Sequence, residues 1–86
     1  MIVGTNTVFP HEGNEFHIQA EDLGMKTKSF EVRVYQGGTV LFQKRISYDD
    51  IVQQELPPSE FEVAVRTRMD KMVHTVEAAI VKGKIP

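Results

Sequence analysis

The segment Glu15-Phe16-His17-Ile18-Gln19-Ala20-Glu21 alternates apolar and polar side chains without a break. This period of two is typical of a β-strand with one buried face and one wet face. Residues 5–9 alternate in the same way and lead into the turn sequence Pro10-His11-Glu12-Gly13-Asn14. A two-residue turn at the centre of that sequence places Phe9 opposite Phe16, so we expect a hairpin whose apolar side chains share one face.

A second hairpin is expected after a loop at residues 22–29. Residues 30–35 again alternate, and Gly37-Gly38 separates them from the apolar run that begins at Val40. A two-residue loop at the glycines would place Tyr35 opposite Val40, whereas a three-residue loop would place Val34 there. We prefer the three-residue loop, Gln36–Gly38, with Val34 opposite Val40 and Val32 opposite Phe42, because it gathers the apolar residues together.

Two helices are expected after the strands. Ser47 resembles a helix cap and predicts a helix of about two turns, which Pro57 and Pro58 then end. Ser59 and Glu62 form a capping box, which predicts the start of a long helix that ends at Gly83. Its apolar stripe comprises Phe61, Val65, Met69, Met72, Val73, Val76, Ala79 and Ile80. We therefore predict one α+β domain over residues 1–86: a four-stranded antiparallel meander, a short helix and a long C-terminal helix packed on one face, in the order ββββα.

Size and composition limit the function classes. A chain of 86 residues buries a modest core, and pairing with a second copy would stabilise it, so we expect a homodimer. The formal net charge of −2 disfavours nonspecific nucleic-acid binding. The chain has no cysteine and no apolar run of membrane-spanning length, so we expect a cytoplasmic protein with no membrane contact.

No residue pattern points to catalysis or to a cofactor. A divalent metal ion could in principle be approached from the wet face of the second strand and from the turn before it, but the spacing specifies no ligand set, so no metal is expected. The residues concerned are His17, Gln19 and Glu21 on the strand and His11, Glu12 and Glu15 at the turn. The serines lie at predicted turns and caps, where their hydroxyls have structural partners. We therefore expect a protein that is not an enzyme and that holds no cofactor.

Two surfaces are the predicted interaction sites. The wet face of the sheet carries an aromatic ring, amides and arginines, which suit a protein partner or single-stranded nucleic acid; its predicted members are His17, Gln19, Arg33, Tyr35, Leu41, Gln43 and Arg45. On the long helix, a narrow strip away from the apolar stripe is a possible dimer seam, and it comprises Val63, His74 and Val81. Ordinary solubilising residues and isolated surface valines would produce the same two patterns.

Two resemblances bear on these expectations. The segment Gly13–Gly24, with its pattern G-x-x-F-H-I-Q-x-E-D-x-G, together with Gly37-Gly38 and the strand that ends in Lys44-Arg45, resembles a small bacterial domain family with no assigned activity. This resemblance covers about half of the chain and implies a shared fold and a domain that occurs alone or as an accessory module, with no catalytic residues. Separately, the predicted ββββα order is similar to that of the Pur-alpha, Whirly and PC4-like folds, which bind single-stranded nucleic acid, commonly as dimers.

The leading functional prediction is a small binding or regulatory module that is not an enzyme, forms a homodimer and contacts an unknown protein partner. The alternative is a single-stranded nucleic-acid-binding domain that uses the wet sheet face. In that alternative the contacts would come from Arg33, Tyr35, Lys44 and Arg45, with Lys26 and Lys28 in the loop.

Overall fold

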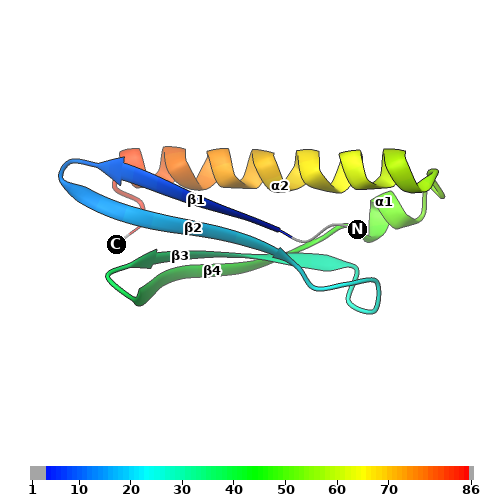
Figure 1. Cartoon of the computed structure of the whole chain (residues 1–86), viewed down its shortest axis with the longest axis horizontal. Helices are drawn as coiled ribbons and strands as arrows, with labels where there is room; N and C mark the ends of the chain where they lie inside the picture. Colours follow the sequence, from blue (N-terminus) through cyan, green and yellow to red (C-terminus); the bar gives the residue numbers. More distant parts are fainter. Residues whose placement is uncertain (1–3, 86) are drawn as a thin grey trace.

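The structure is a computed structural model that describes residues 4–85. Four strands are followed by two helices: β1 (Gly4–His11), β2 (Asn14–Asp22), β3 (Ser29–Gln36), β4 (Thr39–Ser47), α1 (Asp49–Val52) and α2 (Pro58–Val81). The strands form one antiparallel sheet in the order β1-β2-β3-β4, and α2 lies along one face of it (Figure 1). The predicted α+β class and ββββα order are confirmed.

The first hairpin has the predicted register. Phe9 pairs with Phe16, and the turn between the strands consists of Glu12 and Gly13. Both turn residues have positive φ angles, 49° and 80°, as a turn that matches the twist of the flanking strands requires. The apolar side chains of β1 and β2 therefore share the face that packs against α2.

The register predicted for the second hairpin is wrong. Gly37 and Gly38 form a two-residue loop with φ angles of 56° and 82°. The residue that pairs with Val40 is therefore Tyr35, and not Val34 as predicted. A register shift then occurs between Val34 and Tyr35, so that Leu41 is an extra residue on β4. This bulge brings Phe42 opposite Val34. Without the extra residue, the two-residue turn would direct the side chain of Phe42 to the face of the sheet away from the core; with it, Phe42 lies on the core face.

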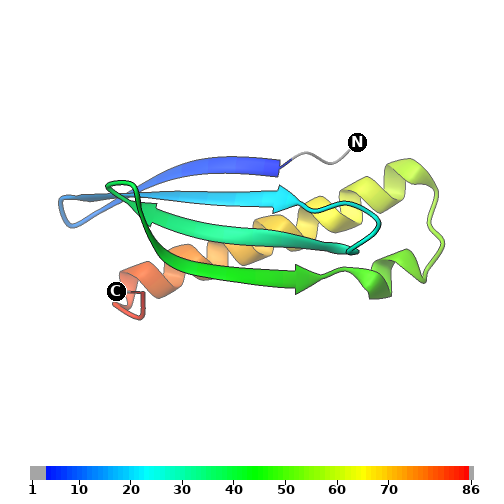
Figure 2. The ribbon, with the colours of Figure 1, turned by 90° about the horizontal axis from the view of Figure 1, so that it is seen from below.

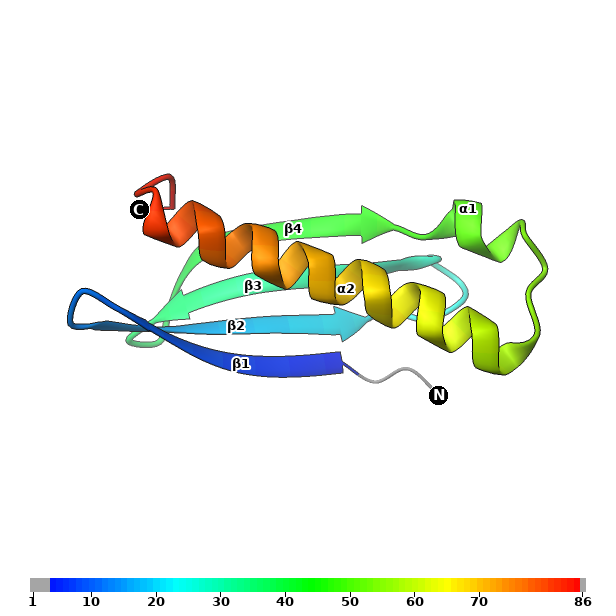
Figure 3. The same ribbon diagram turned by 90° about the horizontal axis from the view of Figure 1, so that it is seen from above.

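The core lies between the sheet and α2. The buried residues come from β2, β3, α2 and the short segment around α1: Phe16, Ile18, Ala20, Phe30, Val32, Val34, Tyr48, Ile51, Val65, Met69, Val73, Val76 and Ile80. Figure 3 shows that α2 crosses the sheet diagonally. All the buried residues of α2 belong to the predicted apolar stripe, and the other stripe residues, Phe61, Met72 and Ala79, are partly buried.

The helix starts differ from the prediction. α1 has only four residues, and Ser47 contributes a bond from the amide of Asp49 to its Oγ at 3.2 Å. α2 begins at Pro58, with Pro57 as the N-terminal cap residue and no side-chain cap bond. The predicted capping box is therefore wrong, because a proline at the first helical position, with its φ already fixed, starts the helix one residue before Ser59.

The C-terminal end of α2 follows the prediction. Gly83 has a φ of 70°, its amide donates to the carbonyl of Ile80, and the amide of Lys84 donates to Ala79. These two bonds satisfy carbonyl groups that the last helical turn leaves open. Within residues 4–85, neither helix combines the length and the apolar character needed to cross a membrane.

Candidate binding surface on the uncovered sheet face

The sheet has a second face, which no helix covers in the described part of the chain (Figure 2). Side chains on this outer face fall into three rows because the strand registers align one residue from each strand. The first row is Val8, His17, Tyr35 and Val40; the second is Asn6, Gln19, Arg33 and Gln43; the third is Gly4, Glu21, Glu31 and Arg45. We call these twelve residues the outer face.

The first row is apolar and aromatic across the whole width of the sheet. Val8 is 53% exposed and Val40 is 47% exposed, so large apolar side chains on both edge strands are open to water. His17 and Tyr35 lie between them and are half-buried by their neighbours. The Nε2 of His17 lies 3.2 Å from Oε1 of Glu15. The row therefore presents one continuous strip rather than four isolated side chains.

A charged cluster fills the middle of the outer face. Glu31 is only 7% exposed although it lies on the uncovered side of the sheet. Its carboxylate accepts a hydrogen bond of 2.9 Å from the side chain of Gln43 and forms an ion pair with Arg33. The hydrogen bond with the neighbouring Tyr35 side chain has the largest effect on the pKa of Arg33, and together with the charge of Glu31 it raises this pKa above its ordinary value. The arginine at the centre of the face is thus held in place and charged.

The environment of Glu31 makes the contribution of its carboxylate to the stability of the fold depend on pH. The hydrogen bond from Gln43 and the charges of Arg33 and Arg45 lower the pKa of Glu31 below 4.5, and they outweigh the opposing effect of burial. A lowered pKa in the folded state means that the charged group stabilises the fold above pH 4.5 and that this stabilisation is lost as the pH falls below that value.

We therefore expect Glu31→Gln to be less stable than the wild type between pH 5 and 8, with the difference narrowing below about pH 4.5. Urea unfolding at several pH values measures this difference. Asp70→Asn, which removes an exposed carboxylate from α2, is the control for the loss of one charge. A difference for Glu31→Gln that stays constant down to pH 3 would show that the carboxylate is not stabilised by its neighbours.

Most of the residues predicted for the binding face lie together on the outer face: His17, Gln19, Arg33, Tyr35, Gln43 and Arg45. Leu41 does not follow the predicted register, because it is the bulge residue and packs against the core cluster. Val40 takes the place beside Tyr35, and Val8 completes the row on β1. Neither valine was among the residues predicted for this face. The signal for Val40 was the two-residue loop at Gly37-Gly38, which was not the preferred register.

The predicted dimer strip lies on the side of α2 that faces away from the sheet. Val63 is 64% exposed, Val81 is 55% exposed and His74 is also exposed. His74 lies eleven positions after Val63 on the helix, a rise of about 16 Å, so the strip is not continuous. Exposed polar residues, Thr67, Asp70 and Lys71 among them, lie between its members.

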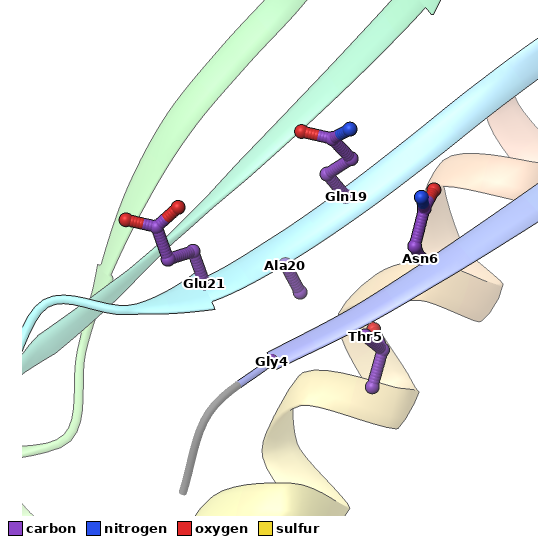
Figure 4. A pocket seen from close by; sticks show the side chains of 6 residues that line it. All are labelled: Gly4, Thr5, Asn6, Gln19, Ala20 and Glu21. Carbon is purple, nitrogen blue, oxygen red and sulfur yellow. The ribbon is translucent and has the colours of Figure 1, made fainter.

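A shallow hollow of about 330 Å³ lies across β1 and β2 at the end of the outer face, lined by Gly4, Thr5, Asn6, Gln19, Ala20 and Glu21. Figure 4 shows the side chains of Asn6, Gln19 and Glu21 on one side of the strands and that of Ala20 on the other. A Cβ atom at Gly4 would collide with the carbonyl oxygen of Ala20. The glycine thus permits the close approach of β1 to β2, and the hollow presents mainly amide and carboxylate groups.

Within residues 4–85 no three His, Asp or Glu side chains converge in a group that could hold a metal ion. His11 and Glu12 lie 3.8 Å apart, and His17 forms its contact with Glu15 on the same strand. No protein-family model, no curated protein and no solved structure matches this chain. Both resemblances drawn from the sequence therefore stay predictions.

Proposed function

We propose that this protein is a small binding module that is not an enzyme, that it acts through protein–protein contacts, and that its outer face docks on a second copy of the same chain. The observation that carries the proposal is the continuous first row, in which Val8, His17, Tyr35 and Val40 span all four strands. Aromatic and apolar side chains with arginine beside them are typical of protein interfaces.

The order of residues along the first two rows makes these two rows of the outer face complementary to themselves. A two-fold axis parallel to the strands, between two face-to-face sheets, places β1 of one copy over β4 of its partner and β2 over β3. In the first row Val8 then faces Val40 of the partner subunit, and His17 faces the partner's Tyr35. In the second row, Gln19 faces Arg33 of the partner subunit. In the first row apolar and aromatic groups thus meet one another, and in the second row hydrogen-bonding groups do. In the third row Glu21 faces Glu31 of the partner subunit, so this row does not favour the association.

The charges and the size of the face fit an association of moderate strength. Glu21 and Glu31 are balanced by Arg33 and Arg45, so two copies do not repel each other through a net charge on this face. Four strands of about eight residues measure about 19 by 26 Å, or about 500 Å². This is less than the ~800 Å² per partner of a standard interface, and we expect dissociation in the micromolar range.

Single-stranded nucleic acid is less well supported as the partner of this face. Tyr35 is the only aromatic side chain in the three rows apart from the His17 imidazole, and Arg33 is already paired with Glu31. Lys44 pairs with Val32, a buried core residue, so its side chain lies on the helix side of the sheet. Of the four sheet residues expected to contact nucleic acid, only Tyr35 and Arg45 are available for it.

We place this module in the cytoplasm. The chain contains no cysteine, so no disulfide contributes to its fold and a reducing compartment suits it. The proposed self-association takes place between identical chains, and it therefore needs no other component. It remains compatible with a further protein partner that competes for the same face.

Light scattering at a series of concentrations tests the proposal. We expect the wild type to dimerise and Tyr35→Ala to weaken the dimer about 30-fold or more, since a large aromatic side chain in an interface can contribute about 2 kcal/mol or more. The double variant Val63→Ala/Val81→Ala, which alters the exposed strip on α2, should dimerise like the wild type. A wild type that stays monomeric at 1 mM, or a dimer lost in the helix variant instead, would contradict the proposal.

A further inference from the structure

The end of the molecule opposite the two hairpin turns carries an apolar groove that the proposed dimer does not use. The β2–β3 loop, α1 and the start of α2 meet there (Figures 1 and 3). One hollow of about 560 Å³ and an adjoining one of about 350 Å³ share Met25, Pro58 and Phe61 in their walls. Each has the size of a small-molecule site, and each is lined mainly by apolar atoms. We call the two hollows the end groove.

A tyrosine–carboxylate pair forms the polar part of the larger hollow. The hydroxyl of Tyr48 donates to Oδ1 of Asp22 at 2.5 Å, and the amide of Gly24 donates to the same oxygen at 3.2 Å. Oδ2 of Asp22 accepts no hydrogen bond from the rest of residues 4–85. The ring of Tyr48 is 1% exposed and packs edge-on against Phe61, with ring centroids 5.8 Å apart. A carboxylate oxygen is thus available beside an apolar wall.

Among the described residues, the lining of the end groove includes the carboxylates of Asp22 and Glu55 and no lysine, arginine or histidine side chain. A third carboxylate in the lining, Glu62, already has positive charge beside it, which lowers its pKa. Lys28, in the adjacent loop, is directed to Asp49 at 3.6 Å. Burial and the Asp22 carboxylate raise the pKa of Tyr48 well above its ordinary value, so the hydroxyl remains a donor and does not add a further negative charge.

Met25 is the exposed part of the apolar wall of the end groove. Its side chain is 55% exposed although it is large and apolar, and it forms part of the wall of both hollows. Apolar walls with a carboxylate of defined position are complementary to an apolar molecule with a single positive charge. We propose that the end groove binds a small apolar molecule that carries one ammonium group, with its hydrocarbon part against Met25 and Phe61 and its ammonium at Oδ2 of Asp22.

Three probes of similar shape separate the effect of a positive charge on the binding affinity from the effect of hydrophobic contact. They are phenethylamine, 2-phenylethanol and phenylacetate. Titration of each into 15N-labelled protein, followed through the amide signals of Gly24 and Met25, measures binding. We expect phenethylamine to bind at least tenfold more tightly than the alcohol and phenylacetate not to bind. Equal affinity for the three probes, tighter binding of phenylacetate, or no signal shifts up to 10 mM phenethylamine would overturn the proposal.

Two variants locate the site. Asp22→Asn keeps an oxygen that can accept the Tyr48 hydroxyl but removes the charge, and we expect it to weaken phenethylamine about tenfold. Asp70→Asn removes a charge from the exposed side of α2 and should leave the affinity unchanged. Equal effects of the two variants would assign the binding to general electrostatic attraction and refute the site. The light-scattering result for Tyr35→Ala is independent of this outcome, since the end groove and the outer face share no residue.

Discussion

Val65→Asp should abolish the folded state. Val65 is fully buried between α2 and the sheet, with 0% of its side chain exposed. The substitution replaces an apolar group with a carboxylate that has no cationic partner in the core, which costs about 4 kcal/mol or more. A domain of this size has a total stability of about 4–13 kcal/mol. We therefore expect circular dichroism and NMR to show a largely unfolded chain at pH 7 and 37 °C.

Thr67→Asp is the matched control for that variant. Thr67 lies two residues further along α2 and is exposed, so the same new charge remains in water. Its hydroxyl donates to the carbonyl of Val63, a bond whose loss has a small effect on an exposed helix. Thr67→Asp should fold normally. If Val65→Asp folded as well as Thr67→Asp, α2 would not be the element that closes the core over the sheet.

The first hairpin could be predicted from the sequence because two independent signals agree there. The alternation around Ile18 fixes which side chains are buried, and the Glu12-Gly13 turn fixes the register that brings Phe9 opposite Phe16. An error of one residue would have moved the apolar side chains of a strand into water. The two signals allow only one arrangement, and the structure has it.

In the second hairpin the same two signals conflict. The Gly-Gly pair favours a two-residue turn, whereas the apolar alternation favours a longer loop. The structure satisfies both by adding a bulge at Leu41. Nothing in the local sequence marks that extra residue, because its effect is to correct the packing of Phe42 against the core, which is a tertiary interaction.

The outer face was predictable in its polar members and not in its apolar ones. Arginine and amide residues are recognised by their alternation with core residues, and Arg33, Gln43 and Arg45 lie where this alternation places them. Val8 and Val40 belong to the outer face only through the pairing of four strands, which a single strand does not reveal. The nearly complete burial of Glu31 likewise depends on side chains from β3 and β4 together.

At the start of α2, a proline pair decides where the helix begins, although a capping-box sequence directly follows it. Ser59 and Glu62 have the spacing of a capping box, but Pro57-Pro58 precedes them. Proline at the first turn needs no amide partner and has a suitable φ angle. The helix therefore begins at Pro58, and this places Pro58 and Phe61 in the wall of the end groove.

A cross-link between Val8→Cys and Val40→Cys should form only between two different chains. Within one chain the two residues lie on the two edge strands, about 14 Å apart, because three strand spacings separate them. In the proposed dimer, Val8 faces Val40 of the partner subunit across packed sheets about 10 Å apart. The natural chain contains no cysteine, so each variant carries one thiol. A short bismaleimide that spans about 10 Å connects two such thiols.

The decisive measurement is therefore the yield of cross-linked dimer from Val8→Cys alone, Val40→Cys alone and an equal mixture of the two. The face-to-face arrangement predicts a high yield in the mixture and little in either single variant, because two copies of the same residue lie at opposite edges of the dimer. Tyr35→Ala in both chains should remove the cross-link. Cross-linking that is strongest in a single variant would indicate edge-to-edge pairing of the sheets, and no cross-linking in the mixture would contradict the proposed docking of the outer face on itself.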